Sequence, residues 1–191
     1  MDVNLNVASN QVDSERRKRV QFSKGRETQA ILMFDAYLDI ETTGLSAVYD
    51  VITVIGIHRD DGNTSAMIQL VGDDVTGPNL IRALENVCTI YTYNGSRFDL
   101  PFIQTFLSVD LTEHYSHHDL MYDCWRMNLY GGFKAVEQKL GIPRRLKGIG
   151  GYDAVRLWRE YRNGGDRRAL ALLLQYNKED VVNLKALRES L

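Results

Sequence analysis

The chain is predicted to fold as one α/β domain around a mixed β-sheet. Three strand patterns follow one another between residues 36 and 71, and a hairpin signal joins the second to the third. Helical and strand patterns then alternate, and from residue 131 onward every pattern is helical. Consecutive strands favour antiparallel pairing, whereas a strand between helices favours parallel pairing. The sheet is therefore expected to contain both.

Each element has its own signal. The strands are short apolar or alternating runs, and Asp60-Asp61-Gly62-Asn63 is typical of the turn between two of them. The helices carry apolar residues three and four positions apart. The predicted strands are 36–41, 51–58, 64–71 and 88–93. The predicted helices are 78–86, 97–107, one between Gly131-Gly132 and Gly141-Ile142-Pro143, 152–161 and 167–189, the last capped by Gly164-Gly165-Asp166.

Length and composition define the class of protein. The chain has 191 residues, of which 44% are hydrophobic and 25% charged, so a fully disordered or fibrous protein is excluded. This length predicts one domain. Residues 1–29 are polar and carry the run Arg16-Arg17-Lys18-Arg19. We interpret them as a solvated arm, with a phosphate-binding segment as the alternative, so the domain is expected to cover 30–191.

The expected location is the cytoplasm. No stretch approaches the roughly 18 consecutive apolar residues of a membrane helix, so no membrane association is expected. The first residues lack the apolar core of a secretion signal. The two cysteines, Cys88 and Cys124, are too few for a disulfide framework.

The balance of charge limits how the chain can bind nucleic acid. It has 23 Lys and Arg against 25 Asp and Glu, for a net charge of −2. A protein that coats duplex DNA through phosphate contacts is usually basic. If this chain acts on nucleic acid, metal ions or local basic patches must neutralise the phosphates.

Two carboxylates stand out in the first predicted strand. Asp39 and Glu41 are two residues apart, with Leu38 and Ile40 as their neighbours. Side chains two apart on a strand share a face, so both carboxylates lie side by side. Like charges this close are costly in a half-buried place unless a cation compensates. Taken alone, the pair is more typical of a solvent-exposed strand face.

A third carboxylate lies where a strand passes into a helix. The segment Tyr93-Asn94-Gly95-Ser96-Arg97-Phe98-Asp99-Leu100-Pro101-Phe102 places Asp99 near the first helical turn. Acids are common there because they complement the helix dipole. The aromatic and apolar neighbours of Asp99, however, indicate partial burial.

The last predicted helix carries a fourth carboxylate. Leu173, Tyr176, Asp180, Leu184 and Leu187 fall on one stripe at spacings of three and four. The stripe is apolar above and below, so Tyr176 and Asp180 are expected to point inward. A buried acid needs a Lys or Arg partner or a metal ion, and the helix by itself favours neither.

Together these segments resemble the three exonuclease motifs of the DEDD superfamily, which has a ribonuclease H-like fold. They are YLDIETTGL (37–45), YNGSRFDLPF (93–102) and Tyr176-x3-Asp180, in that order. The tyrosine four residues before the last Asp is similar to the tyrosine branch, which includes the proofreading domains of family B DNA polymerases. HHDLMYDCWR, GGFKAVEQKLGIPR, AVRLW and ALLLQYNKEDVVNL resemble the stand-alone YprB-like family. The resemblance covers about residues 36–187.

The resemblance implies a metal-dependent 3′-5′ exonuclease that hydrolyses phosphodiester bonds at the 3′ ends of single-stranded DNA or RNA. Two divalent ions, Mg²⁺ or Mn²⁺, would activate the water and neutralise the leaving oxygen. Asp39 would bridge them, Glu41 and Asp180 would complete the site of the nucleophile-activating ion, and Asp99 would support the other. Tyr176 would orient the attacking water. The residues implied at the substrate are Thr42, Thr43, Gly44, Leu45, Asn94 and Phe98, with Leu45 against the terminal base.

Several features of the sequence have more than one interpretation. Two basic clusters, at 144–147 and 156–168, either steer the strand or are solvated charged faces. His114, His117, His118 and Asp119 resemble zinc ligands, but no cysteine lies near and Asp119 matches a strand position of the family. The alternative functions are a structure-specific endonuclease of related fold and a non-catalytic nucleic-acid-binding module. Whether DNA or RNA is the substrate depends on contacts to the 2′-OH, which no motif reveals.

Overall fold

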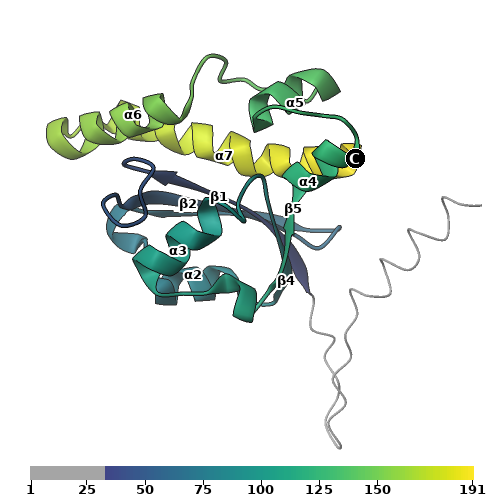
Figure 1. Ribbon diagram of the computed structural model, residues 1–191. Coiled ribbons are helices and arrows are strands. Elements are labelled where there is room, and N and C mark those ends of the chain that lie inside the picture. Colours follow the sequence, from purple (N-terminus) through teal and green to yellow (C-terminus); the bar gives the residue numbers. More distant parts are fainter. Residues whose placement is uncertain (1–32) are drawn as a thin grey trace, which may run out of the picture.

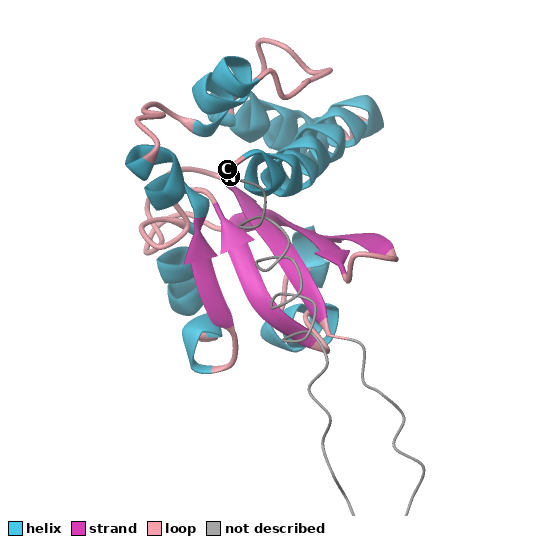
Figure 2. Ribbon diagram, turned by 90° about the vertical axis from the view of Figure 1, so that its right-hand side faces the viewer, coloured by secondary structure: helices cyan, strands magenta, loops and turns pink. Residues whose placement is uncertain are grey.

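The computed structural model describes residues 33–191, which form a five-stranded sheet with helices on both faces (Figure 1, Figure 2). The strand order is β3-β2-β1-β4-β5. The predicted polar arm, residues 1–29, lies outside the described residues. Over the part that is described, no helix has both the length and the apolar character needed to span a membrane.

The sheet is mixed, as predicted. β2 pairs antiparallel with both β1 and β3, while β4 pairs parallel with β1 and with β5. In the β2–β3 turn, Asp61 accepts hydrogen bonds from the backbone N–H groups of Asn63 and Thr64, at 2.8 and 2.7 Å. The strands are β1 Phe34–Thr42, β2 Ile52–Asp60, β3 Ser65–Val71, β4 Val87–Thr92 and β5 Ser116–Asp119.

The predicted helices are all present, with their ends shifted by a few residues. The helices are α2 Gly77–Ala83, α3 Asp99–Leu107, α4 Leu120–Arg126, α5 Phe133–Leu140, α6 Gly151–Gly164 and α7 Arg167–Ser190, and the short 3₁₀ turns are Gly72–Asp74 and Leu111–Glu113. α2 ends before the predicted Asn86 because that residue adopts a left-handed conformation, φ 61°, and turns the chain into β4. β5 and α4 were not among the predicted elements.

β1 is the central strand, and its two faces meet different helices. Leu38 and Ile40 pack into the core formed with α2 and α3. The opposite face, which carries Tyr37, Asp39 and Glu41, lies under α7, with α4, α5 and α6 grouped around that helix (Figure 1). The period-two prediction is therefore confirmed for this strand.

The sheet opens on one side of β1 just before its acidic end. The β1–β4 ladder stops at the pair Tyr37 and Tyr91, whereas the β1–β2 ladder continues to Thr42. The start of α3 lies beside the unpaired edge, because the Ile40 N–H donates to Asp99 rather than to β4. The last residues of β1 are thus reached by α7 on one face and by α3 along one edge.

Candidate metal centre and substrate cavity

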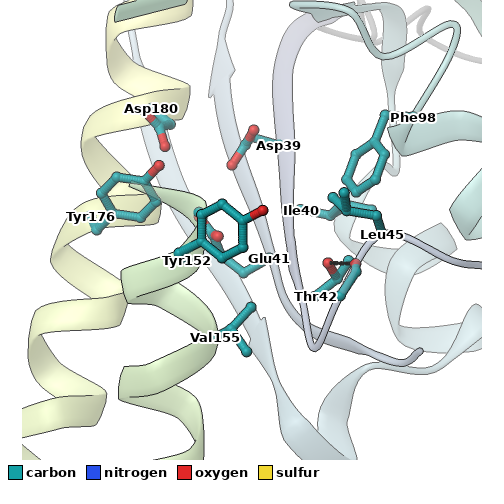
Figure 3. A pocket seen from close by; sticks show the side chains of 12 residues that line it. Asp39, Ile40, Glu41, Thr42, Leu45, Phe98, Tyr152, Val155, Tyr176 and Asp180 are labelled. Atoms are coloured by element: carbon teal, nitrogen blue, oxygen red, sulfur yellow. Dashed lines mark hydrogen bonds between the residues drawn. The ribbon is translucent and has the colours of Figure 1, made fainter. Parts of the chain in front are cut away.

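Three carboxylates from two elements converge at the end of β1. Asp39 and Glu41 come from β1 and Asp180 from the middle of α7, and one oxygen of each lies within 4.8 Å of the others. Figure 3 shows Asp39 on β1 and Asp180 on α7 facing each other, with Glu41 partly hidden behind Tyr152. Glu41 and Asp180 are each 6% exposed, so the cluster is largely shielded from water. Along residues 33–191 this is the one such group of potential metal ligands.

A glycine in the neighbouring strand allows α7 to come this close. Gly56 of β2 is the register partner of Asp39. A Cβ at Gly56 would lie 2.2 Å from Oδ1 of Asn177, so only glycine leaves room for that side chain. Asn177 Nδ2 donates to Oδ2 of Asp39 at 3.2 Å, while its Oδ1 accepts from Gln69 at 2.9 Å. The amide is therefore held with its donor toward Asp39.

Asp99 approaches the same strand from its edge. It is the first residue of α3, is 4% exposed, and accepts a hydrogen bond of 3.1 Å from the backbone N–H of Ile40. That N–H lies between the two acidic residues of β1, so Asp99 is placed beside Asp39 and Glu41. It does not belong to the group of three carboxylates that share the 4.8 Å spacing.

Burial and crowding keep these acids from ionising easily. Desolvation, followed by repulsion from Asp180, raises the pKa values of Asp39 and Glu41 well above their ordinary values. Burial raises the pKa of Asp99 to about 7. Oε1 of Glu41 is buried and has no hydrogen-bond partner in the described part of the chain. A buried oxygen without a partner lowers the stability of the fold. Hard divalent cations prefer oxygen ligands, so the site fits a metal ion.

Two basic residues flank the acids, and neither was predicted to hold the site together. Arg144 is paired with Asp180 and makes two hydrogen bonds to Glu137, at 2.8 and 2.9 Å. Its side chain is 9% exposed, so for this residue the reading as part of a solvated charged face is wrong. Lys134 Nζ donates to the Tyr176 hydroxyl and to the Ile149 carbonyl, both at 2.6 Å. No sequence pattern singles out Lys134.

Tyr176 points inward, as the helical stripe predicted. It lies one turn before Asp180 on α7 and is 5% exposed (Figure 3). Burial and the surrounding carboxylates raise the pKa of its hydroxyl strongly. The group is therefore a neutral phenol at neutral pH, able to accept from Lys134 and still donate its own proton.

The carboxylates form one wall of a cavity of about 340 Å³. The β1–β2 turn and α3 form the second wall, and the first turns of α6 form the third. The lining residues are Asp39, Ile40, Glu41, Thr42, Gly44, Leu45, Phe98, Gly151, Tyr152, Val155, Tyr176 and Asp180. The three residues from α6 were not predicted from the sequence.

Four of the six predicted substrate residues lie in this cavity, namely Thr42, Gly44, Leu45 and Phe98. Thr43 does not: its hydroxyl donates to Asp50 at 3.1 Å and accepts from the Val51 N–H at 3.0 Å, and so closes the β1–β2 turn. Asn94 also lies outside the cavity lining, and its backbone N–H donates to Asp119 at 2.7 Å.

The candidate zinc ligands are used in separate contacts. Asp119 accepts hydrogen bonds from the backbone N–H groups of Asn94, Ser96 and Met121, so it ties β5 to the loop before α3. His117 contacts the Thr92 hydroxyl at 2.9 Å, and His118 contacts Asp123.

Comparison with known proteins places this fold and site in a class. A family model described as the RNase H superfamily matches residues 36–191, so the chain belongs to that superfamily. Membership and the acidic cluster together identify it as a nuclease of the superfamily. A search of curated proteins gives no match.

Several solved structures share the fold. The chain is similar to a structure described as the apo form of a nuclease, with 19% identity and a TM-score of 0.56 over 94% of this chain and 74% of that one. It is similar to NrnC of Brucella melitensis, with 19% identity and a TM-score of 0.55 over 84% and 72%. It also matches the family B DNA polymerase of Pyrobaculum calidifontis, with 15% identity and a TM-score of 0.62 over 86% of this chain but 25% of the polymerase.

Proposed function

We propose that the chain is a metal-dependent 3′-5′ exonuclease of the tyrosine branch of the DEDD superfamily, related to the YprB-like family. Its substrates are the 3′ ends of single-stranded DNA or RNA. One observation carries the proposal: a single cavity joins the Asp39, Glu41 and Asp180 carboxylates to Tyr176 and to an apolar wall. An acid cluster alone would be compatible with any metal site, but the adjoining cavity provides a place for the nucleotide to be removed.

The residues have distinct parts in this proposal. Asp39, Glu41 and Asp180 hold one divalent ion, Mg²⁺ or Mn²⁺, and Asp99 with Asp39 supports a second. When bound, the ions lower the pKa of the attacking water and neutralise the charge on the leaving oxygen. Two features support this assignment, namely the unpartnered oxygen of Glu41 and the raised pKa values of Asp39 and Glu41. A bound cation would give that oxygen a partner and would stabilise the ionised carboxylates.

Tyr176 orients the attacking water. Its raised pKa makes it a poor general base at neutral pH, so its hydroxyl acts through hydrogen bonding. Lys134 donates to one lone pair of that oxygen and fixes where the remaining lone pair and the O–H can point. The hydroxyl is thereby held in one direction beside Asp180. Lys134 is a positioning residue in this scheme.

The size of the cavity supports action on single-stranded ends. At about 340 Å³ it lies at the small end of ligand pockets, with room for one nucleotide rather than a base pair. A duplex end would first have to unpair and unstack, which costs a few kcal/mol. Single strands are therefore the preferred substrate.

The test is a time course of hydrolysis with single-stranded DNA and RNA, labelled at the 5′ or the 3′ end, with Mg²⁺ or with excess chelator. The proposal predicts mononucleotides released from the 3′ end and no hydrolysis in chelator. Cuts inside a circular single strand would indicate an endonuclease instead. Binding without metal-dependent hydrolysis would indicate a non-catalytic module.

A further inference from the structure

The first turn of α6 places an aromatic ring at the substrate cavity. Tyr152 is the second residue of α6, and its ring stands between that helix and the β1–β2 turn, across from Leu45 and Phe98 (Figure 3). The residue is 91% exposed. Within residues 33–191 it makes no hydrogen bond and no ring contact, so its packing contributes little to the stability of the fold.

The opposite wall is also apolar and open. Leu45, on the β1–β2 turn, is 82% exposed, and Phe98, which precedes α3, lies next to it (Figure 3). Two apolar surfaces from different elements thus face the same space, which the acids close on a third side. A ligand that fills this space has a flat apolar part between the walls and an oxyanion beside the metal-binding acids. A nucleobase attached to its own phosphate has this chemistry.

We propose that the 3′-terminal nucleobase stacks on Tyr152, with Leu45 and Phe98 covering its other side. This inference rests on the proposed function, and it assigns to Tyr152 a role that no sequence motif gives it. Tyr152 positions the substrate: stacking fixes the base, and the phosphodiester attached to it is then brought to the acids.

The lining of the cavity also defines the specificity. Apart from the metal-binding acids and Tyr176, its polar side chains are Tyr152 itself and Thr42, whose hydroxyl donates to the Gly44 carbonyl at 2.5 Å. No Asn, Gln, Arg or Lys side chain lines the space to read the edge of a base. Recognition therefore depends on stacking, which every base permits. All four bases are accepted, purines bind more tightly than pyrimidines because their rings are larger, and an abasic end binds least.

The test separates stacking from catalysis. Binding of fluorescein-labelled ten-nucleotide single-stranded DNA is measured by anisotropy in Ca²⁺, with adenine, thymine or no base at the 3′ end. Hydrolysis of the same strands is measured in Mg²⁺. The variants are Tyr152→Ala and Tyr152→Phe. The matched control is Tyr49→Ala, because Tyr49 is 89% exposed on the β1–β2 turn but does not line the cavity.

For base-bearing ends, Tyr152→Ala is expected to raise Kd and KM by about 5- to 150-fold, the range typical of one lost base–aromatic stack. Tyr152→Phe keeps the ring and should bind like the wild type, as should the control. The strand with an abasic end should bind the wild type as weakly as base-bearing strands bind Tyr152→Ala. The substitution should not weaken the binding of the abasic strand further.

Three results are decisive. If Tyr152→Ala leaves Kd unchanged, or weakens abasic and base-bearing ends equally, the stacking role is wrong even when hydrolysis proceeds as proposed. If base-dependent binding needs Tyr152 but no hydrolysis occurs, the stacking role stands and the exonuclease assignment fails. If the wild type binds none of the three strands, both are wrong.

Discussion

β1 and α7 meet at two places, and the acids of β1 have different partners at each. Near the start of β1, Asp35 accepts a hydrogen bond of 2.6 Å from Arg188 of α7, which also donates to the Tyr37 hydroxyl at 3.1 Å. Near the end of β1, Asp39 and Glu41 instead face another acid of α7, Asp180. The same two elements therefore form an ion pair at one contact and a cluster of like charges at the other.

The difference favours the acidic contact as the functional one. A half-buried acid paired with an arginine is an ordinary structural solution. Acids that face one another raise each other's pKa values and weaken the metal-free fold, and such violations of local rules are expected at functional sites. Because α7 does supply cations near its end, the absence of one opposite Asp39 and Glu41 is consistent with a place kept for a metal ion.

The largest expected effect comes from changing one acid at each contact. Asp39→Asn should lower the rate of hydrolysis about 10³-fold or more, since a positioned metal ion contributes several kcal/mol to transition-state stabilisation. The metal-free variant should be at least as stable as the wild type because a repulsive charge is removed. Asp35→Asn should instead retain activity and lose about 1–3 kcal/mol of stability, as expected when a largely buried arginine loses its charged hydrogen-bond partner. The measurements are the initial rates of hydrolysis and the urea unfolding of both variants. An active, unchanged Asp39→Asn together with an inactive Asp35→Asn would contradict the assignment of the two contacts.

In the described chain, Arg144 is the one cation that forms an ion pair with an acid of this contact. Removing it should therefore make the metal-free contact still less stable. Arg144→Met leaves Glu137 and Asp180 buried without their partner, and the free energy of unfolding in chelator should fall by about 3–5 kcal/mol. Added Mn²⁺ should recover part of the loss, because the ion neutralises Asp180. Arg145→Met, at the exposed neighbouring position, is the control and should change little. An equal effect of both substitutions would show that the buried pairing is unimportant.

The hydroxyl of Tyr176 should matter to the reaction rather than to the fold. Tyr176→Phe keeps the ring and should slow single-turnover hydrolysis by roughly tenfold to a few hundredfold, the loss of one positioned group. Lys134→Met should slow it by about tenfold, and adding this change to Tyr176→Phe should cost little more, because both act through the same oxygen. Rates that multiply independently in the double variant would mean that Lys134 acts elsewhere.

The metal-free protein should also show a dependence of stability on pH. The pKa of Asp99 is raised by burial to about 7, and those of Asp39 and Glu41 are also raised, whereas the same acids titrate near 4 when unfolded. Between about pH 4 and 7 the folded protein binds more protons, so its free energy of unfolding in chelator falls as the pH rises. The slope is at most about 1.4 kcal/mol per pH unit for each acid. Urea unfolding from pH 5 to 8 should show this decline, and Asp99→Asn should make it shallower. A stability that rises over this range would contradict the assignment.

Much of the architecture can be predicted from the sequence, because it depends on local patterns. The alternation in β1 predicts that Asp39 and Glu41 share a face, and the stripe on α7 predicts that Tyr176 and Asp180 point inward. β5 and α4 escape prediction: Ser116-His117-His118-Asp119 lacks apolar alternation, and its position depends on long-range hydrogen bonds that Asp119 accepts from the backbone N–H groups of Asn94 and Ser96.

The rest of the site escapes prediction for a similar reason. Lys134 and Asn177 are polar residues on helices, and Arg144 lies in the loop between α5 and α6. Neither helical periodicity nor loop composition distinguishes a solvated polar side chain from one that reaches a buried acid. Tyr152 is exposed, so it carries no signal of packing at all. Their roles appear only when α5, α6 and α7 are assembled over the end of β1.

In the proposed function, the acidic contact between β1 and α7 binds a divalent metal ion. The most direct measurement is the melting temperature at pH 7.5 as a function of Mn²⁺ concentration, for the wild type, Asp39→Asn and Asp35→Asn. Binding to the folded state raises the melting temperature. The wild type and Asp35→Asn should therefore melt at progressively higher temperature as Mn²⁺ is added, while Asp39→Asn should respond little. An unchanged wild type, or an equal rise in Asp39→Asn, would contradict the metal centre.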